Sequence, residues 1–299
     1  MNVAKSYLRA VKLKADEVFS PGVKHMLAAT FWFALMNLLV KFLAHLPTME
    51  LVFFRCGVAS LISFVALYRA KIDWIGSNRL LLLLRGLFGN IALFTFFYSL
   101  QHMPLGTAVT IQYISPVFTS IFAIFLLNEI VRPVQWLFFA ISFAGVLMIK
   151  GVDTGISWQL LTIGIISAVF SALAYNMVRT LREKEHPLVV VLHFQLLGAV
   201  AGGIVSVFVW ETPQGMDWIL LLLVGIFTQL GQENLTRSLQ SENIARVSIL
   251  NYLGIGYALL FGWLFFNEQH HLMELAGIIL IVTGVILNVV LFKNKAIKS

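Results

Sequence analysis

Charged residues are scarce in this sequence. They make up 12% of its 299 residues, whereas soluble domains contain roughly 25%. The single cysteine, Cys56, excludes a disulfide within the chain. There is no P-loop, no HExxH motif, no carboxylate pair at a fixed spacing and no Cys/His cluster with metal-ligand spacing. These absences argue against an enzyme and against ATP-driven transport by this chain, and they give no reason to expect a metal or another cofactor.

Long apolar runs dominate instead, because 59% of the residues are hydrophobic. A bilayer span needs about 20 apolar residues in a row. The runs are continuous, which predicts helices and disfavours the alternating strands of a β-barrel. The sequence therefore predicts an all-α integral membrane protein that contacts lipid over most of its surface. We expect ten spans, at about 23–45, 48–68, 80–100, 104–127, 133–150, 158–179, 187–209, 217–237, 244–266 and 272–292.

The second half of the chain repeats the first. Ser99-Leu100-Gln101 returns 139 positions later as Ser238-Leu239-Gln240, and Asn128-Glu129 returns as Asn267-Glu268. Each copy contains five spans, so the two copies must enter the membrane from opposite sides. This pattern predicts two inverted five-helix repeats, an architecture that many secondary transporters share.

Four segments follow from this division. Residues 1–21 form a basic N-terminal segment, 22–150 the first repeat, 151–292 the second repeat and 293–299 a basic tail. Placing both termini in the cytoplasm puts most of the 21 Lys and Arg residues on the cytoplasmic side, as the positive-inside rule expects. The net charge of +7 is then explained by topology, so it gives no indication of nucleic-acid binding.

Several motifs of the first copy resemble those of a known family. They are Phe53-Phe54-Arg55, Arg85-Gly86, Tyr98-Ser99-Leu100, the stretch Pro104-Leu105-Gly106-Thr107-Ala108 and the stretch Gln112-Tyr113-Ile114-Ser115-Pro116. With these motifs the chain resembles an EamA-type member of the drug/metabolite transporter superfamily. The resemblance implies a ten-helix metabolite carrier, often an exporter, in the inner (plasma) membrane of a bacterium. It leaves open whether the protein is a monomer or a homodimer.

Polar residues inside the spans are the candidates for substrate binding, because a charge at the bilayer centre costs about 2.5–3.5 kcal/mol unless it faces a cavity or a partner. Some recur in both copies, and for these interhelical hydrogen bonding is an equally simple explanation. The recurring residues are Asn37 and Asn176, Gln112 and Asn251, and Tyr113 and Tyr252.

Three cations occur in one copy only and are better suited to an asymmetric substrate. Lys41, Arg55 and Arg85 are replaced in the second copy by Thr180, Phe194 and Val224. The structural alternative is an ion pair of Lys41 or Arg55 with Glu50, at the start of the second span. Arg85 and Lys41 also lie close enough to span ends to reach the membrane surface.

Two titratable residues are candidates for proton coupling, Glu233 and His193. Glu233 shares a helix face with Gln229 and Gln232, and it also stands four residues before Arg237. An ion pair with Arg237 is therefore the alternative to a proton-carrying role. The adjacent His270-His271 falls in an expected outer loop, where exposure to solvent is a simpler explanation than a metal site.

These residues predict a secondary or exchange transporter that works by alternating access. The favoured substrate is a small carboxylate-bearing metabolite, such as an amino acid or an organic acid. The alternatives are a nucleoside-like metabolite, such as S-adenosylmethionine or a nucleotide sugar, and a cationic drug. A membrane-embedded transferase is the alternative from another class, and the inverted repeat argues against it.

Overall fold

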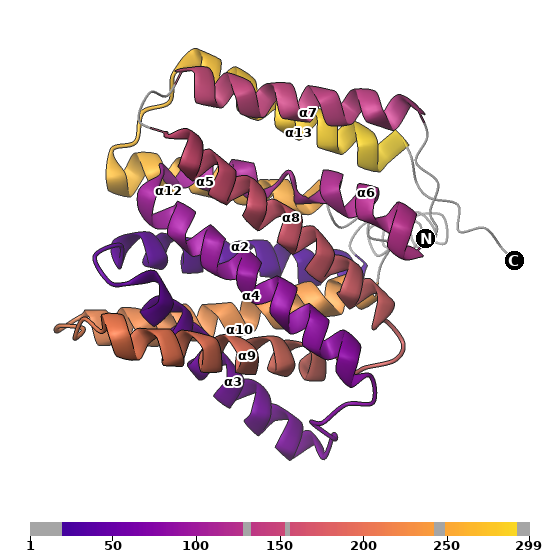
Figure 1. The fold of residues 1–299 in the computed structure, drawn as a ribbon, viewed down its shortest axis with the longest axis vertical. Coiled ribbons are helices and arrows are strands. Elements are labelled where there is room, and N and C mark those ends of the chain that lie inside the picture. Colours follow the sequence, from indigo (N-terminus) through magenta and orange to yellow (C-terminus); the bar gives the residue numbers. More distant parts are fainter. Residues whose placement is uncertain (1–19, 128–132, 153–155, 242–248, 292–299) are drawn as a thin grey trace, which may run out of the picture.

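The computed structural model describes residues 20–127, 133–152, 156–241 and 249–291, which form helices and no strand. Figure 1 shows the helices running roughly side by side between two ends of the molecule. Among the described helices, seven spanning segments are long and apolar enough to cross a bilayer, and three more apolar helical segments are somewhat shorter. Together they correspond to the ten expected spans.

The first repeat consists of α2 (Pro21–Phe42), α3 (Thr48–Ala70), α4 (Arg79–His102), the broken pair α5 (Leu105–Gln112) and α6 (Ser115–Leu127), and α7 (Pro133–Val152). The second consists of α8 (Trp158–Thr180), α9 (Pro187–Val209), α10 (Asp217–Ser241), the pair η1 (Ile249–Tyr252) and α12 (Leu253–Phe266), and α13 (Leu272–Leu291). The helix ends fall close to the expected positions. The basic N-terminal segment up to Phe19, Asn128-Glu129 and the tail lie outside the described residues.

Local sequence signals explain where two equivalent helices begin. Ser20 accepts a hydrogen bond from the Val23 amide at 3.4 Å and precedes Pro21, whose fixed φ suits the first helical turn. In the second repeat Ser157 caps α8 in the same way, with the Leu160 amide at 3.1 Å. A short polar cap therefore opens the first helix of both repeats.

The two repeats are interlocked. Helix α2 packs along α10 of the other repeat, and the equivalent α8 packs along α4, while α3 lies against its own counterpart α9. In Figure 1, α2 and α8 run in opposite directions, as an inverted repeat requires. Gly86 of α4 leaves space for Leu197 of α9, and the equivalent Gly225 of α10 leaves space for Val58 of α3. The same small-residue contact is thus made twice, related by the 139-residue offset.

Some residues contact their own counterparts, which places them beside the pseudo-two-fold axis. The rings of Tyr113 and Tyr252 are 5.6 Å apart, and the Ser142 hydroxyl is 3.5 Å from the carbonyl oxygen of Ile281. At the crossing of α7 and α13, a Cβ at Gly145 would lie 2.5 Å from the carbonyl of Gly277, so only glycine permits this approach. Figure 1 shows α7 and α13 paired at one edge of the bundle.

The fourth span is broken, which corrects the expectation of one continuous helix over 104–127. Helix α5 ends at Gln112, the chain turns at Tyr113 and Ile114, and α6 begins at Ser115. Pro116 has no N–H to donate to the carbonyl of Gln112, so the helical ladder stops there. Non-helical backbone at membrane depth is tolerated where protein covers it or where it lines a cavity. The ninth span changes from η1 to α12 at the equivalent Tyr252.

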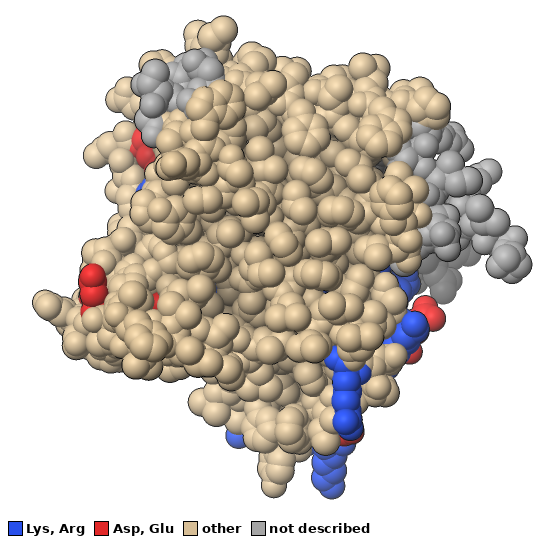
Figure 2. Space-filling model, in the orientation of Figure 1, with Lys and Arg blue, Asp and Glu red and all other residues tan. Residues whose placement is uncertain are grey.

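Charged side chains gather at the ends of the bundle. In Figure 2 most of the basic side chains on the visible face lie toward the lower right, and the broad middle carries none. That end contains Arg79 at the start of α4 and Arg182 in the α8–α9 loop, whereas Glu211 and Asp217 lie at the opposite end. We call these the basic end and the acidic end. A charge-free middle between two charged ends is what a surface facing the bilayer core requires.

A central cavity with two buried guanidinium groups

Seven helices enclose a cavity of about 120 Å³ in the middle of the bundle. Helices α2, α3, α4, α5, α8, α9 and α10 all contribute to its wall, and α7 and α13 do not. The described polar residues that line it are Asn37, Arg55, Arg85, Gln112, Tyr113, Ser171, Tyr175 and Gln232. None of the described residues that line this cavity is acidic.

Arg55 reaches the cavity from α3. Its side chain is 2% exposed, its Nε donates to the Thr228 hydroxyl at 3.0 Å, and its Nη1 is 3.6 Å from the sulfur of Cys56. The guanidinium carbon lies 5.3 Å from the centre of the Phe97 ring and 5.6 Å from that of Phe194. Cation–π contact and one hydroxyl stabilise this charge, but no carboxylate among the described residues pairs with it.

Arg85 reaches the same cavity from α4. Its residue is 4% exposed, and its guanidinium carbon lies 4.3 Å from the centre of the Phe194 ring. Its Nε has no hydrogen-bond partner among the described residues. Gly89, one turn further along α4, makes room for it, because a Cβ there would overlap Arg85 and lie 2.9 Å from the Phe194 ring. Arg85 therefore does not extend to the membrane surface, although the sequence allowed that.

The helix break forms another part of the cavity wall. The Gln112 amide donates to the Ser171 hydroxyl at 2.6 Å and accepts from the Ser167 hydroxyl at 2.7 Å. These bonds hold the side chain of Gln112 where α5 ends. Tyr113 follows directly in the turn, so the break presents an amide and a phenol to the cavity. A discontinuous helix at the binding site is a recurring feature of transporter folds.

Asn37 and Asn176 are equivalent in sequence but differ in surroundings. Asn37 lines the cavity, and its amide oxygen has no hydrogen-bond partner among the described residues. Asn176 instead donates to the carbonyl oxygens of Thr119 and Ala172, at 3.2 and 3.1 Å. The first asparagine faces open space, and the second joins two helices.

The other pairs are divided in the same way. Tyr252 packs behind Tyr113 and donates to its carbonyl oxygen at 3.4 Å, so it supports the cavity wall without lining it. Asn251 lies in η1 and is not among the lining residues. Five of the predicted substrate residues thus surround one cavity, and all five come from the first repeat: Asn37, Arg55, Arg85, Gln112 and Tyr113.

Lys41 lies elsewhere, toward the acidic end. It donates to the carbonyl of Met103 and forms an ion pair with Glu268 at 3.8 Å. The suggested ion pair of Lys41 or Arg55 with Glu50 is wrong, because Glu50 accepts from the Glu211 amide at 3.1 Å in the neighbouring loop. Position along α3 explains the difference, since Glu50 stands in its first turn and faces that loop.

Glu268 and His270 extend this group of paired charges, which we call the acidic-end network. Glu268 accepts a hydrogen bond from the Leu105 amide at 2.8 Å. It therefore caps helix α5 of the first repeat and not α13, the helix that follows it in the chain. His270 lies 3.0 Å from Glu274, which accepts from the Thr107 hydroxyl at 2.7 Å. The expectation that the pair His270-His271 is exposed to solvent is wrong for His270, whose side chain is only 10% exposed, and confirmed for His271, which is exposed.

The two proton-coupling candidates lie outside the cavity. Glu233 accepts from Arg237 at 3.0 and 2.7 Å, which confirms the ion pair that the spacing allowed. His193 lies 3.0 Å from the carbonyl oxygen of Val189, one turn back in α9. Neither residue lines the cavity, whereas Gln232, beside Glu233, does.

Three residues that complete the site were not predicted as part of it. Phe194 and Tyr175 line the cavity, and Thr228 holds Arg55. A sequence signal existed for Phe194, because it is the counterpart of Arg55 and helices α3 and α9 are adjacent across the pseudo-two-fold axis. For Tyr175 and Thr228 the sequence signal was weaker, because their counterparts in the first repeat, Met36 and Gly89, are not predicted site residues.

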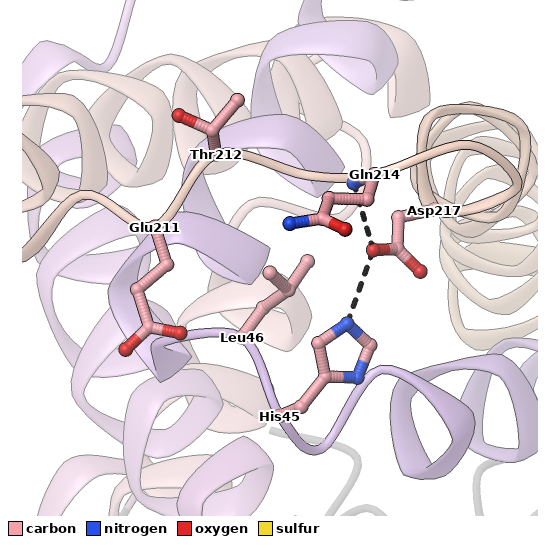
Figure 3. A pocket seen from close by; sticks show the side chains of 6 residues that line it. All are labelled: His45, Leu46, Glu211, Thr212, Gln214 and Asp217. Carbon is pink, nitrogen blue, oxygen red and sulfur yellow. Dashed lines mark hydrogen bonds and ion pairs between the residues drawn. The ribbon is translucent and has the colours of Figure 1, made fainter.

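A second, wider pocket opens among the loops of the acidic end (Figure 3). It is lined by His45, Leu46, Glu211, Thr212, Gln214 and Asp217. Asp217 accepts from the Gln214 amide at 3.0 Å and lies 3.1 Å from Nε2 of His45, so the contacts tie the α2–α3 loop to the start of α10. Loops line this pocket and no buried unpaired charge faces it among the described residues, so the central cavity is the better candidate site.

The sequence matches the model of the EamA-like transporter family twice, over residues 20–151 and 158–290. The pseudopaline exporter CntI of Pseudomonas aeruginosa is 32% identical over 276 residues, which cover 90% of this chain and 96% of that protein. Human solute carrier family 35 member G1 is 29% identical, covering 88% of this chain and 77% of that one. A riboflavin transporter of Rhizobium johnstonii is 27% identical, over 82% and 83% of the two chains.

A solved structure shares the fold. It superposes with a TM-score of 0.64 at 18% identity and covers 91% of this chain and 99% of that one. The two family matches coincide with the two interlocked repeats and together span nearly the whole chain. This protein is a multi-pass membrane transporter, not an enzyme, and it belongs to the EamA-like transporter family.

Proposed function

We propose that this transporter is a secondary or exchange carrier of small carboxylate-bearing metabolites, which bind in the central cavity and gain access to each side in turn. The observation that carries the proposal is the presence of two buried guanidinium groups, Arg55 and Arg85, at one cavity without an acidic residue among its described lining. Buried cations are costly unless they are paired, so a carboxylate on the substrate supplies the missing partner. Arginine is suited to bind it through two parallel hydrogen bonds.

The two-fold arrangement supports alternating access. The cavity lies between interlocked repeats that run in opposite directions, and a rocking motion of one repeat against the other exposes such a site to each side in turn. Export is the favoured direction, and the name of the Pseudomonas aeruginosa relative agrees with it. Coupling to protons through Glu233 or His193 remains a prediction.

The alternatives fit the cavity less well. Aromatic side chains such as Phe97, Tyr113 and Phe194 are suited to stack on a nucleobase. However, the cavity of about 120 Å³ is small beside ligand pockets of about 300–1,000 Å³. A cationic drug is disfavoured because it would approach two positive charges.

Uptake into proteoliposomes tests this function. The purified protein is reconstituted with one anionic, one zwitterionic and one cationic compound in turn, and uptake of labelled compound is measured against empty liposomes. We expect uptake of carboxylates and none of the cation. Uptake of the cation alone would contradict the proposal.

Orientation is tested separately. We propose that both termini and the basic end face the cytoplasm, because Arg79, Arg182 and their neighbours lie there. A cysteine placed at Glu211 should then react with a membrane-impermeant maleimide added outside intact cells, and one placed at Arg182 should not. The opposite labelling pattern would reverse the orientation.

A further inference from the structure

We propose that the central cavity selects substrates that carry two negative charges, with Arg55 and Arg85 each binding one of them. The inference rests on the proposed function, since it assumes that the central cavity binds an anion. It narrows the substrate class from carboxylates in general to dianions, such as dicarboxylates.

The central cavity carries two buried positive charges. Arg55 and Arg85 are 2% and 4% exposed, so water screens neither of them well. They line the same cavity, and their guanidinium carbons lie 5.6 and 4.3 Å from the centre of the same ring, that of Phe194. Two like charges at a poorly solvated site repel one another. One monoanion leaves a net positive charge behind, and one dianion does not.

Both guanidinium groups lie beside the ring of Phe194. Arg85 and Arg55 both approach its ring, at 4.3 and 5.6 Å from the ring centre, and Arg55 also approaches Phe97. Ring faces attract cations but carry no net charge. The rings lower the free-energy cost of burying the two guanidinium groups in the carrier without substrate. When a substrate binds, each guanidinium group can exchange its ring contact for a carboxylate.

The lining of the cavity also favours a dicarboxylate over a zwitterion. An amino acid brings an ammonium group as well as a carboxylate, and the described lining offers that ammonium no carboxylate, only amides and hydroxyls such as Asn37 and Tyr175 and aromatic rings such as Phe194, which both arginines already approach. Two neighbouring cations oppose it. A second carboxylate in the same position meets an unpaired Nε of Arg85 instead. The cavity is therefore more favourable to a dicarboxylate than to an amino acid of equal length.

The repeat shows that this charge is not required by the fold. The counterparts of Arg55 and Arg85 are Phe194 and Val224, so the equivalent positions of the second repeat are apolar. Both charges come from the first repeat, and a dianion therefore binds against one side of an otherwise symmetric cavity. Such asymmetry is what selective binding of one substrate class needs.

The test uses matched probes in counterflow with the full-length protein in proteoliposomes. Succinate, butyrate and 4-aminobutanoate share a four-carbon chain with one carboxylate and differ at the other end, which is anionic, apolar or cationic, and glutarate, pentanoate and 5-aminopentanoate repeat the comparison one carbon longer. We expect the dicarboxylate of each series to be exchanged about tenfold or more faster than its monocarboxylate and its amino acid at equal low concentration.

Variants show whether the two arginines cause this preference. Arg85→Gln should reduce the ratio of dicarboxylate to monocarboxylate exchange about tenfold, and Arg55→Gln should reduce the same ratio of binding affinities about tenfold, because each variant removes one site charge. Arg182→Gln makes the same change at an exposed position of the basic end and should leave the ratio unchanged. Binding of succinate and of butyrate, measured by thermal stabilisation in detergent, repeats the comparison independently of transport.

The outcomes separate the two proposals. If monocarboxylates or amino acids are exchanged as fast as dicarboxylates, the dianion inference is wrong and the carboxylate carrier stands. If none of the six probes is exchanged or bound while a cation is taken up, both proposals fail. If either glutamine variant is unstable, the wild-type ratios alone decide, since equal rates within both series overturn the inference.

Discussion

The central cavity and the acidic-end network handle buried charge in opposite ways. Arg55 and Arg85 face a shared space, and their partners among the described residues are aromatic rings, one hydroxyl and one thiol, with no carboxylate. Lys41, Glu268, His270 and Glu274 pair with one another and with neighbouring backbone. The difference teaches that a charge inside this membrane protein is either satisfied by the fold or left for a ligand. Substitutions at residues of each group distinguish the two kinds of charge, and we expect the largest effect at Arg55.

Arg55→Ala should abolish transport while protein level and monodispersity stay near wild type. The substitution removes the charge that we propose contacts the substrate. It breaks no ion pair among the described residues, because the hydrogen-bond partners of Arg55 there, Thr228 and Cys56, are neutral. Arg55→Lys should recover little, because an ammonium does not reproduce the planar fork of a guanidinium. Transport by Arg55→Ala at the wild-type rate, measured in proteoliposomes, would place Arg55 among the purely structural residues.

Lys41→Met should act on stability and not on substrate choice. It leaves Glu268, which is 12% exposed, without its cation, and a buried acceptor that loses its partner costs about 1–3 kcal/mol. Lys41→Met combined with Glu268→Gln should recover part of the loss, although Glu268 also caps α5. Thermal unfolding in detergent measures both. A change in the dicarboxylate to monocarboxylate ratio would instead bring Lys41 into the substrate path.

Glu233→Gln decides whether the ion pair with Arg237 excludes a proton role. The pair is intact at 2.7 Å, so we expect the variant to lower thermal stability modestly and to keep pH-driven accumulation. Counterflow and pH-driven uptake are measured side by side. Loss of accumulation with preserved counterflow would show that Glu233 carries the coupled proton despite its partner.

Glu185 at the basic end should show the smallest effect. Its Oε1 accepts from the amides of Ser77 and Asn78 at 2.7 and 2.6 Å and so ties the α8–α9 loop to the start of α4. Partial burial raises the pKa of Glu185, but these hydrogen bonds outweigh it and hold the pKa below its ordinary value.

A lowered pKa stabilises the protein above the unfolded-state pKa, and the contribution is lost as the pH falls through the folded-state value. We therefore expect the wild type to be more stable than Glu185→Gln at neutral pH. The difference should shrink as the pH falls below about 4.3, the ordinary value for glutamate. Thermal unfolding of both proteins between pH 7 and the lowest pH that the detergent micelle tolerates checks this. A difference that does not change with pH would show that the carboxylate charge is not involved.

Much of the architecture could be predicted because lipid imposes simple rules. Every backbone group in the bilayer must be satisfied, so an apolar run of sufficient length must be a helix. That rule and the repeat predicted ten spans in two inverted sets, and Phe194 as the counterpart of Arg55. The break after Gln112 was not predicted, although Pro116 marks it, because apolar character continues across it.

The partners of the polar residues were the part that only tertiary structure decided. Asn37 and Asn176 are identical in type and equivalent in position, yet one faces the cavity and the other bonds to Thr119. Lys41 and Glu268 lie far apart in the chain and meet only because the repeats interlock. Apolar length and charge placement are local properties, so the sequence by itself determined the spans and the repeat. Pairing depends on which helices become neighbours, so only the folded bundle decided that Arg55 and Arg85 would share one cavity whose described lining contains no carboxylate.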